Sequence, residues 1–132
     1  FRGSLPADEL IEYLVNSDCY VHPSHIENSP NSVCEAMLIG TPVIATYAGG
    51  TSTIVQNGSE GILVQDGDHY VLAGAIMELI HSPGQMNVYS ENARKRALER
   101  HNPQTVVSRI LDIYQDVLKS DKNVFSQSNN YR

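Results

Sequence analysis

Residues 19–46 read CYVHPSHIENSPNSVCEAMLIGTPVIAT. Two short β-prone runs, residues 19–22 and 43–46, enclose a helical segment from residue 30 to 39 with apolar residues on one face. The second run is apolar and β-branched without alternation, which is typical of a strand covered on both faces. A strand, a helix and a buried strand in this order predict a βαβ unit with parallel strands.

The alternation of helix and strand continues on both sides of this unit. Upstream, the spacing predicts a helix over residues 5–16 with four apolar side chains on one face, Leu10, Ile11, Leu14 and Val15. Downstream, it predicts a helical turn at 51–55, a third strand at 62–64, a helix capped by Asp68, and two helices over 83–100 and 102–118. The predicted fold class is therefore α/β, a thin parallel sheet flanked by helices that forms half of a doubly wound domain.

The length and the ends of the chain set its expected organisation. The 132 residues suit one domain, which we expect to occupy residues 1–120. The polar, Asn- and Ser-rich stretch 121–132 is expected to be a disordered tail. Because the chain starts at Phe1 without an initiator methionine, we expect it to be a piece of a longer protein.

Charge and cysteine content exclude several classes of function. Nine basic against fifteen acidic residues give a net charge of −6, which argues against a nucleic-acid partner. No run approaches the roughly 18 apolar residues of a membrane span. Cys19 and Cys34 lack metal-ligand spacing and are expected to be free thiols, so a cytoplasmic location is expected. A basic cluster, Arg94, Lys95, Arg96 and Arg100, is interpreted as a solvated helix face, with peripheral contact at the inner face of a membrane as the alternative.

The chemistry is expected in two loops that follow strands, residues 22–32 and 46–51, because ligands of open α/β sheets bind at the carboxyl ends of the strands. Ser29 precedes Pro30 and should be extended, so we expect Ser29 to be a helix N-cap and Pro30 the first helical residue. The first N–H groups of that helix, with its dipole, suit a phosphate or sugar hydroxyls.

Two carboxylates flank this helix start. Glu27 precedes the expected cap, and Glu35 falls in the second helical turn. In a continuous helix they would lie about 12 Å apart along the axis, whereas a folded-back loop at Glu27 lets both face one ligand. Glu35 leans back towards the pocket because helical side chains tilt towards the N-terminus. The simpler interpretation is that an acidic residue near a helix start only complements the dipole.

The smaller signals have plain structural interpretations. His22 and His25 have no third ligand at a fixed spacing, so packing and polar contacts are expected rather than a metal site, with His25 the closer of the two to the pocket. Ser24 lacks the setting of a nucleophile and is expected to hydrogen-bond within its loop. Gly49 and Gly50 are expected to let the backbone approach a ligand.

Taken together, these residues carry a family resemblance. From Pro23 to Gly50 the sequence follows the pattern PSxxExxPxSVxEAMxxGxPVIAxxxGG. This pattern resembles the GT4-type glycosyltransferases of the GT-B fold, the glycosyl transferases group 1, with Glu27 and Glu35 matching their E-x7-E motif. The similarity covers roughly residues 1–118, and its combined motifs are specific.

The resemblance implies the C-terminal, Rossmann-like donor-binding domain of a retaining, metal-independent enzyme without a cofactor, which transfers a hexosyl-type group from a nucleotide-diphosphate sugar. Acceptors of such enzymes are glycans, lipid-linked molecules or polysaccharide precursors. In the family, the residue matching Glu35 binds the ribose hydroxyls, and the residue matching Glu27 lies against the donor sugar and is linked to catalysis. The implied donor-binding set is His25, Asn28, Ser29, Pro30, Asn31, Ser32, Val33, Glu35, Gly49 and Gly50.

The sequence also departs from the family pattern. Many members have Gly-Phe-Gly after the first Glu, where this chain has Asn28-Ser29-Pro30, and many have a Glu where this chain has Thr53. The family's phosphate-binding Arg and Lys and its N-terminal acceptor domain normally lie upstream of this segment. We therefore expect residues 1–132 alone not to transfer sugar. The competing hypotheses are a nucleotide-sugar epimerase of the same fold and a non-catalytic module for nucleotide-sugar binding or assembly.

Overall fold

A computed structural model describes residues 2–128, with side chains described for residues 2–119. The chain divides into two compact units, Phe1–Leu98 and Glu99–Arg132, which are described separately. The first unit holds the sheet and the candidate site, and the second consists mainly of one long helix.

The sheet of the first unit has three parallel strands in the order β1-β2-β3. Strand β1 spans Tyr20–His22, β2 spans Val43–Thr46 and β3 spans Gly61–Val64. Their register places Val21 beside Ile44 and Ile44 beside Ile62. All three predicted strands are confirmed within a residue or two, and so is the predicted parallel α/β architecture.

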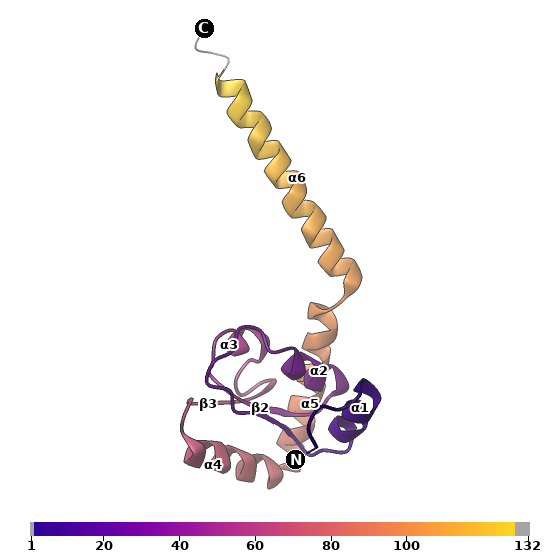
Figure 1. Ribbon diagram of the computed structural model, residues 1–132, viewed down its shortest axis with the longest axis vertical. Coiled ribbons are helices and arrows are strands. Elements are labelled where there is room, and N and C mark those ends of the chain that lie inside the picture. Colours follow the sequence, from indigo (N-terminus) through magenta and orange to yellow (C-terminus); the bar gives the residue numbers. More distant parts are fainter. Residues whose placement is uncertain (1, 129–132) are drawn as a thin grey trace. The chain divides into compact units, whose positions relative to one another are not determined.

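Helices cover both faces of this sheet, and α4 lies on the side opposite α2 and α3 (Figure 1). The helices of this unit are α1 (Ala7–Val15), α2 (Asn31–Ile39), α3 (Thr51–Ile54), α4 (His69–Ile80) and α5 (Pro83–Arg100, which reaches the unit's end). Asp68 caps α4 as predicted, because its carboxylate accepts hydrogen bonds from the N–H groups of Tyr70 and Val71.

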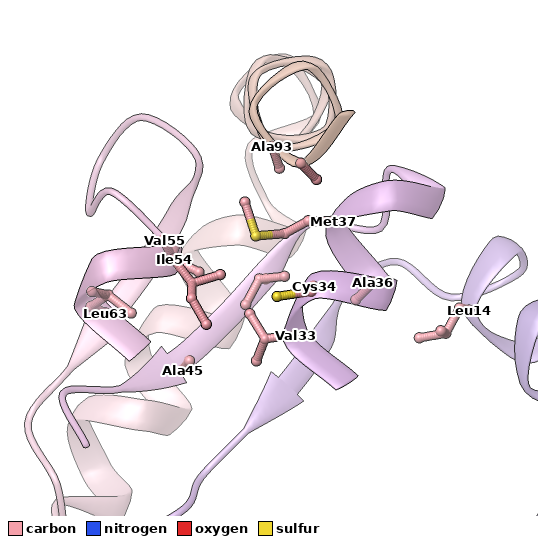
Figure 2. Close-up of a cluster of buried hydrophobic side chains, with 12 residues drawn as sticks. Leu14, Val33, Cys34, Ala36, Met37, Ala45, Ile54, Val55, Leu63 and Ala93 are labelled. Atoms are coloured by element: carbon pink, nitrogen blue, oxygen red, sulfur yellow. The ribbon is translucent and has the colours of Figure 1, made fainter. Parts of the chain in front are cut away.

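The side chains of β2 alternate between two hydrophobic clusters. Val43 and Ala45 pack with α2, α3 and α5, where Met37 lies beneath Ala93 of α5 (Figure 2). Ile44 points to the other face and packs with α4 and Tyr89. Because both faces of β2 are covered, its four residues are fully buried, which explains the unbroken apolar run in the sequence.

The predicted core faces of the outer helices are only partly buried. In α1, Leu14 is buried, whereas Ile11 and Val15 are exposed. In α4, Ala75 and Leu79 are buried, whereas Val71 is exposed. The stripes predicted for these two helices are therefore wider than the surfaces that bury them.

The basic cluster on α5 is exposed, as interpreted from the sequence, and two of its members also make specific contacts. Arg94 donates hydrogen bonds to the carbonyl oxygens of Leu38 and Ile39, at 2.6 and 3.1 Å, and so caps the C-terminal end of α2. A cation at a helix C-terminus complements the helix dipole. The guanidinium of Arg96 contacts the buried carboxylate of Glu60 at 3.2 Å.

Glu60 and Arg96 are expected to make a measurable contribution to stability. The Glu60 side chain is 7% exposed and also accepts a hydrogen bond from the N–H of Gln56 at 2.8 Å. Removing Arg96 leaves a buried carboxylate with fewer partners, so Arg96→Ala should lower the free energy of unfolding by about 1–2 kcal/mol. At exposed Lys95, the substitution Lys95→Ala should change the free energy of unfolding by no more than about 0.5 kcal/mol. Urea unfolding measures both, and equal effects of the two variants would contradict the assigned ion pair.

The second unit contains α6, which spans Pro103–Ser128. Asn102 caps it by accepting hydrogen bonds from the N–H groups of Gln104 and Thr105. The apolar side chains of α6 between Val106 and Leu118 are exposed, from 41% at Val106 to 64% at Tyr114. The expected tail, residues 121–132, overlaps the end of α6. The side chains of this tail lie outside the described residues, so the disorder expected for it stays a prediction.

Candidate functional site

The loop after β1 is folded by its own hydrogen bonds at the carboxyl edge of the sheet. The hydroxyl of Thr46, the last residue of β2, donates to the carbonyl oxygen of Ser24. The hydroxyl of Ser24 donates to the carbonyl oxygen of Ile26 at 2.9 Å, so the role expected for Ser24 within its loop is confirmed. These bonds turn the chain back before Glu27. The segment that carries Glu27 is therefore a folded loop and not part of a helix.

The carboxylate of Glu27 is held on both of its oxygens. Its Oε2 lies 3.0 Å from Nε2 of His22, and its Oε1 accepts the N–H of Asn28 at 3.0 Å. The Glu27 side chain is 24% exposed and that of His22 16%. The sequence predicts packing and polar contacts for His22, but it does not identify Glu27 as the partner. A signal was available, since His22 ends a strand and a tight turn brings the fifth residue after it within reach.

Two glycines after β2 make room for this loop. Gly49 has a φ of +50°, and a Cβ there would overlap the carbonyl oxygen of Glu27. A Cβ on Gly50 would overlap the carbonyl oxygen of Asn28, which accepts the N–H of Gly50 at 2.8 Å. Gly49 and Gly50 therefore lie close to the loop that carries Glu27, while their expected approach to a ligand stays a prediction.

The start of α2 differs from the prediction. The helix begins at Asn31 with Pro30 at the N-cap position, and no side chain caps it, so the expected cap by Ser29 is wrong. The φ of Pro30, −70°, suits a helix, but its ψ of 107° is extended. The first intrahelical bond runs from the N–H of Cys34 to the carbonyl of Pro30, which leaves the N–H groups of residues 31–33 ahead of it.

The remaining predicted residues of this segment differ in accessibility. Asn28, Ser29 and Asn31 are exposed, and Ser32 is half-buried. Val33 is fully buried in the core, with no surface of its own open to a ligand.

Glu35 is exposed and borders a groove between α1 and α2. The groove has a volume of about 320 Å³ and is otherwise apolar, with Ala7, Leu10, Ile11, Leu14, Leu38 and Ile39 as its other lining residues. Glu27 contacts His22 and the N–H of Asn28, and that it faces one ligand together with Glu35 stays a prediction.

His25 points towards the loop after β3. Its Nδ1 lies 2.5 Å from a carboxylate oxygen of Asp66. It lines an open pocket of about 230 Å³ together with Pro23, Thr46, Gln65, Gly67, Asp68, His69 and Leu72. The two histidines therefore contact different carboxylates: His22 contacts Glu27, and His25 contacts Asp66.

Metal and thiol chemistry have little support at this edge. Across residues 2–119, no group of three or more His, Cys, Asp or Glu side chains is arranged to hold a metal ion. Burial, and secondarily the adjacent Asp18 carboxylate, raises the pKa of the Cys19 thiol above its usual value, so this thiol is protonated at neutral pH.

Within the described part of the chain, no helix has the length and apolar character needed to cross a membrane.

Comparison with known proteins agrees with this geometry. Residues 1–96 match the family described as glycosyl transferases group 1, and the chain belongs to that family. It is 33% identical over 127 residues to a D-inositol 3-phosphate glycosyltransferase of Acidothermus cellulolyticus, covering 96% of this chain and 28% of the relative. It is 30% identical to the capsular polysaccharide biosynthesis glycosyltransferase CapM of Staphylococcus aureus, covering 85% of this chain and 30% of the relative. The chain thus spans less than a third of these relatives.

Solved structures give the same assignment of the fold. Sucrose-phosphate synthase from Thermosynechococcus elongatus matches with a TM-score of 0.80 and 28% identity over 91% of this chain and 30% of that protein. Anabaena Alr3699/HepE in complex with UDP-glucose matches with a TM-score of 0.76 and 28% identity over 85% of this chain and 31% of that protein. The predicted Rossmann-like sheet with flanking helices, part of a GT-B fold, is confirmed.

Proposed function

We propose that the chain is the donor-binding part of a GT4-type glycosyltransferase that uses a nucleotide-diphosphate sugar. The observation that carries this proposal is the Glu27 carboxylate, held on both oxygens at the carboxyl edge of the sheet in the loop that leads to α2. Family membership and the UDP-glucose bound by Alr3699/HepE support it. The transferred group is of hexosyl type, and the reaction is retaining and needs no metal or cofactor.

Different residues of the site bind different parts of the donor. The N–H groups of Asn31 and Ser32, ahead of the first intrahelical bond, face the pyrophosphate at the positive end of the α2 dipole. Glu27 accepts hydrogen bonds from hydroxyls of the donor sugar, and Glu35 accepts them from the ribose. His25 and the Gly49–Gly50 turn complete the rim of the site. Preorganised donors and acceptors of this kind stabilise developing charge without reorganisation.

Other parts of the reaction are assigned outside these residues. A departing pyrophosphate needs cations, and we assign these and the acceptor to a further domain, so residues 1–132 alone transfer no sugar. A glycan, lipid-linked molecule or polysaccharide precursor is the proposed acceptor, which the name of the relative CapM supports. The free Cys19 thiol and the nucleotide-sugar donor favour the cytoplasm.

Calorimetric titration with UDP, GDP and ADP tests donor binding in the full-length protein that contains these residues. One of the three should bind, and Glu35→Ala should weaken it about 10-fold, because a hydrogen bond to a charged group contributes about 1.5 kcal/mol. Exposed Glu78 on α4 gives the matched control, Glu78→Ala, with unchanged affinity. Absence of binding by all three nucleotides would contradict the proposal, and conversion of a free nucleotide sugar without an acceptor would favour an epimerase.

A further inference from the structure

We infer that His22 is a positioning residue for Glu27, and that Tyr20 in turn orients His22; this inference rests on the proposed function. The three side chains form a continuous series of contacts. The Tyr20 hydroxyl lies 3.4 Å from Nδ1 of His22, and Nε2 of His22 lies 3.0 Å from Oε2 of Glu27. The series ends at the carboxylate that the proposed function places against the donor sugar.

The first two members of the series are rigidly placed. Tyr20 and His22 are two residues apart on β1 and therefore project from the same face of the strand. Their strand is fixed by pairing with β2, where Tyr20 lies beside Val43 and His22 beside Ala45. The Tyr20 side chain also packs against the hydrophobic cluster under α2. Tyr20 and His22 therefore give Glu27, which lies on a loop, a support built on the sheet.

The chemistry of the groups fixes the direction of the hydrogen bonds. An ionised carboxylate only accepts, so Nε2 of His22 must carry a hydrogen to bond to Glu27. In a neutral imidazole the other nitrogen, Nδ1, is then an acceptor, and the Tyr20 hydroxyl is its donor. Tyrosine thus selects the histidine tautomer that serves the carboxylate, as a hydrogen-bond partner on the far nitrogen does in metal and hydrolase sites.

This arrangement prepares the carboxylate for a sugar. With His22 on Oε2 and the N–H of Asn28 on Oε1, the carboxylate plane is fixed while lone pairs remain for sugar hydroxyls. Without His22, one backbone contact remains, and the carboxylate must be ordered when the donor binds. Removal of His22 should therefore lower the affinity for the nucleotide sugar and leave the affinity for the free nucleotide unchanged.

Four variants of the full-length protein separate these roles. His22→Phe removes the ring N–H groups, His22→Gln keeps a side-chain N–H donor, and Tyr20→Phe removes only the hydroxyl. His81, the residue that follows the last residue of α4, supplies the control His81→Phe. Calorimetry compares UDP with UDP-glucose, or the corresponding GDP-mannose or ADP-glucose pair when GDP or ADP is the nucleotide that binds. Nitrogen-15 NMR of labelled histidine reports which nitrogen of His22 carries the hydrogen.

The expected pattern is specific to positioning. His22→Phe should lower the affinity for the nucleotide sugar about 10-fold and change the affinity for the free nucleotide less than twofold. His22→Gln should recover most of the lost affinity. Tyr20→Phe should give an intermediate loss and a shift of the His22 nitrogen resonances towards the other tautomer. Thermal unfolding identifies any variant that fails to fold, and in that case the Tyr20→Phe comparison decides.

Two different results overturn two different claims. A wild-type protein that binds neither the nucleotide nor the nucleotide sugar overturns the proposed function. A wild-type protein that binds both, with an unchanged affinity ratio in His22→Phe, overturns only the positioning role. A wild-type spectrum with hydrogen on Nδ1 and none on Nε2 of His22 also overturns it, because that tautomer cannot donate to Glu27.

Discussion

Gly49→Ala is expected to lower the free energy of unfolding by about 3–5 kcal/mol and to abolish donor binding. Two costs add at this position. Its φ of +50° lies in the left-handed region that alanine adopts reluctantly. In addition, the new Cβ would occupy the space of the Glu27 carbonyl group, so the loop that carries Glu27 must move. Movement of that loop breaks the contact between Glu27 and His22.

Two other glycines separate the two costs. Gly58 has a φ of +76° with open space around it, so Gly58→Ala measures the left-handed strain alone, about 1 kcal/mol. Gly50 has an ordinary φ of −82°, but its Cβ would overlap the carbonyl oxygen of Asn28, so Gly50→Ala measures the steric cost alone. Urea unfolding of the three variants should rank Gly49→Ala as the most destabilised. A Gly49→Ala variant as stable as Gly58→Ala would show that the loop yields freely.

The centre of the sheet could be predicted from the sequence because its middle strand, β2, is buried on both faces. A run such as Val43–Thr46 has no solvent-facing position, and its β-branched residues exclude most alternatives. Helix starts were harder, and the prolines show why. Pro83 and Pro103 occupy the first helical position, whereas Pro6 and Pro30 occupy the N-cap. Proline fixes φ, which suits both positions, and the undetermined ψ decides between them.

The residues assigned to the candidate site stay a prediction, whereas most of their contacts could not be predicted at all. The spacing of Glu27 and Glu35 identified the motif, while the partner of Glu27 depended on a turn whose geometry is set by Thr46 on another strand. Likewise, Arg94 reads as a surface residue in sequence, yet it binds carbonyl groups more than fifty residues away. Contacts made across the fold carry no periodicity, so local pattern reasoning cannot find them.

Glu27→Gln is expected to reduce sugar transfer 10²- to 10³-fold while leaving nucleotide affinity within about twofold. The amide keeps the size of the side chain and one oxygen for the N–H of Asn28. It removes the negative charge, however, and presents N–H groups to the N–H of His22, so the contact now measuring 3.0 Å is lost. Release of the nucleoside diphosphate from the nucleotide sugar measures transfer, and calorimetry with the free nucleotide measures binding.

The control and the neighbouring variant make this result interpretable. Glu78→Gln on α4 removes one charge far along that helix from the site and should keep transfer unchanged. Glu27→Asp keeps the charge but shortens the side chain, so it should lose His22 and recover only part of the activity. Full activity in Glu27→Gln would remove Glu27 from the donor site. An equal loss of affinity for the nucleotide and the nucleotide sugar would instead show that Glu27 shapes the loop, because a sugar contact leaves free nucleotide binding intact.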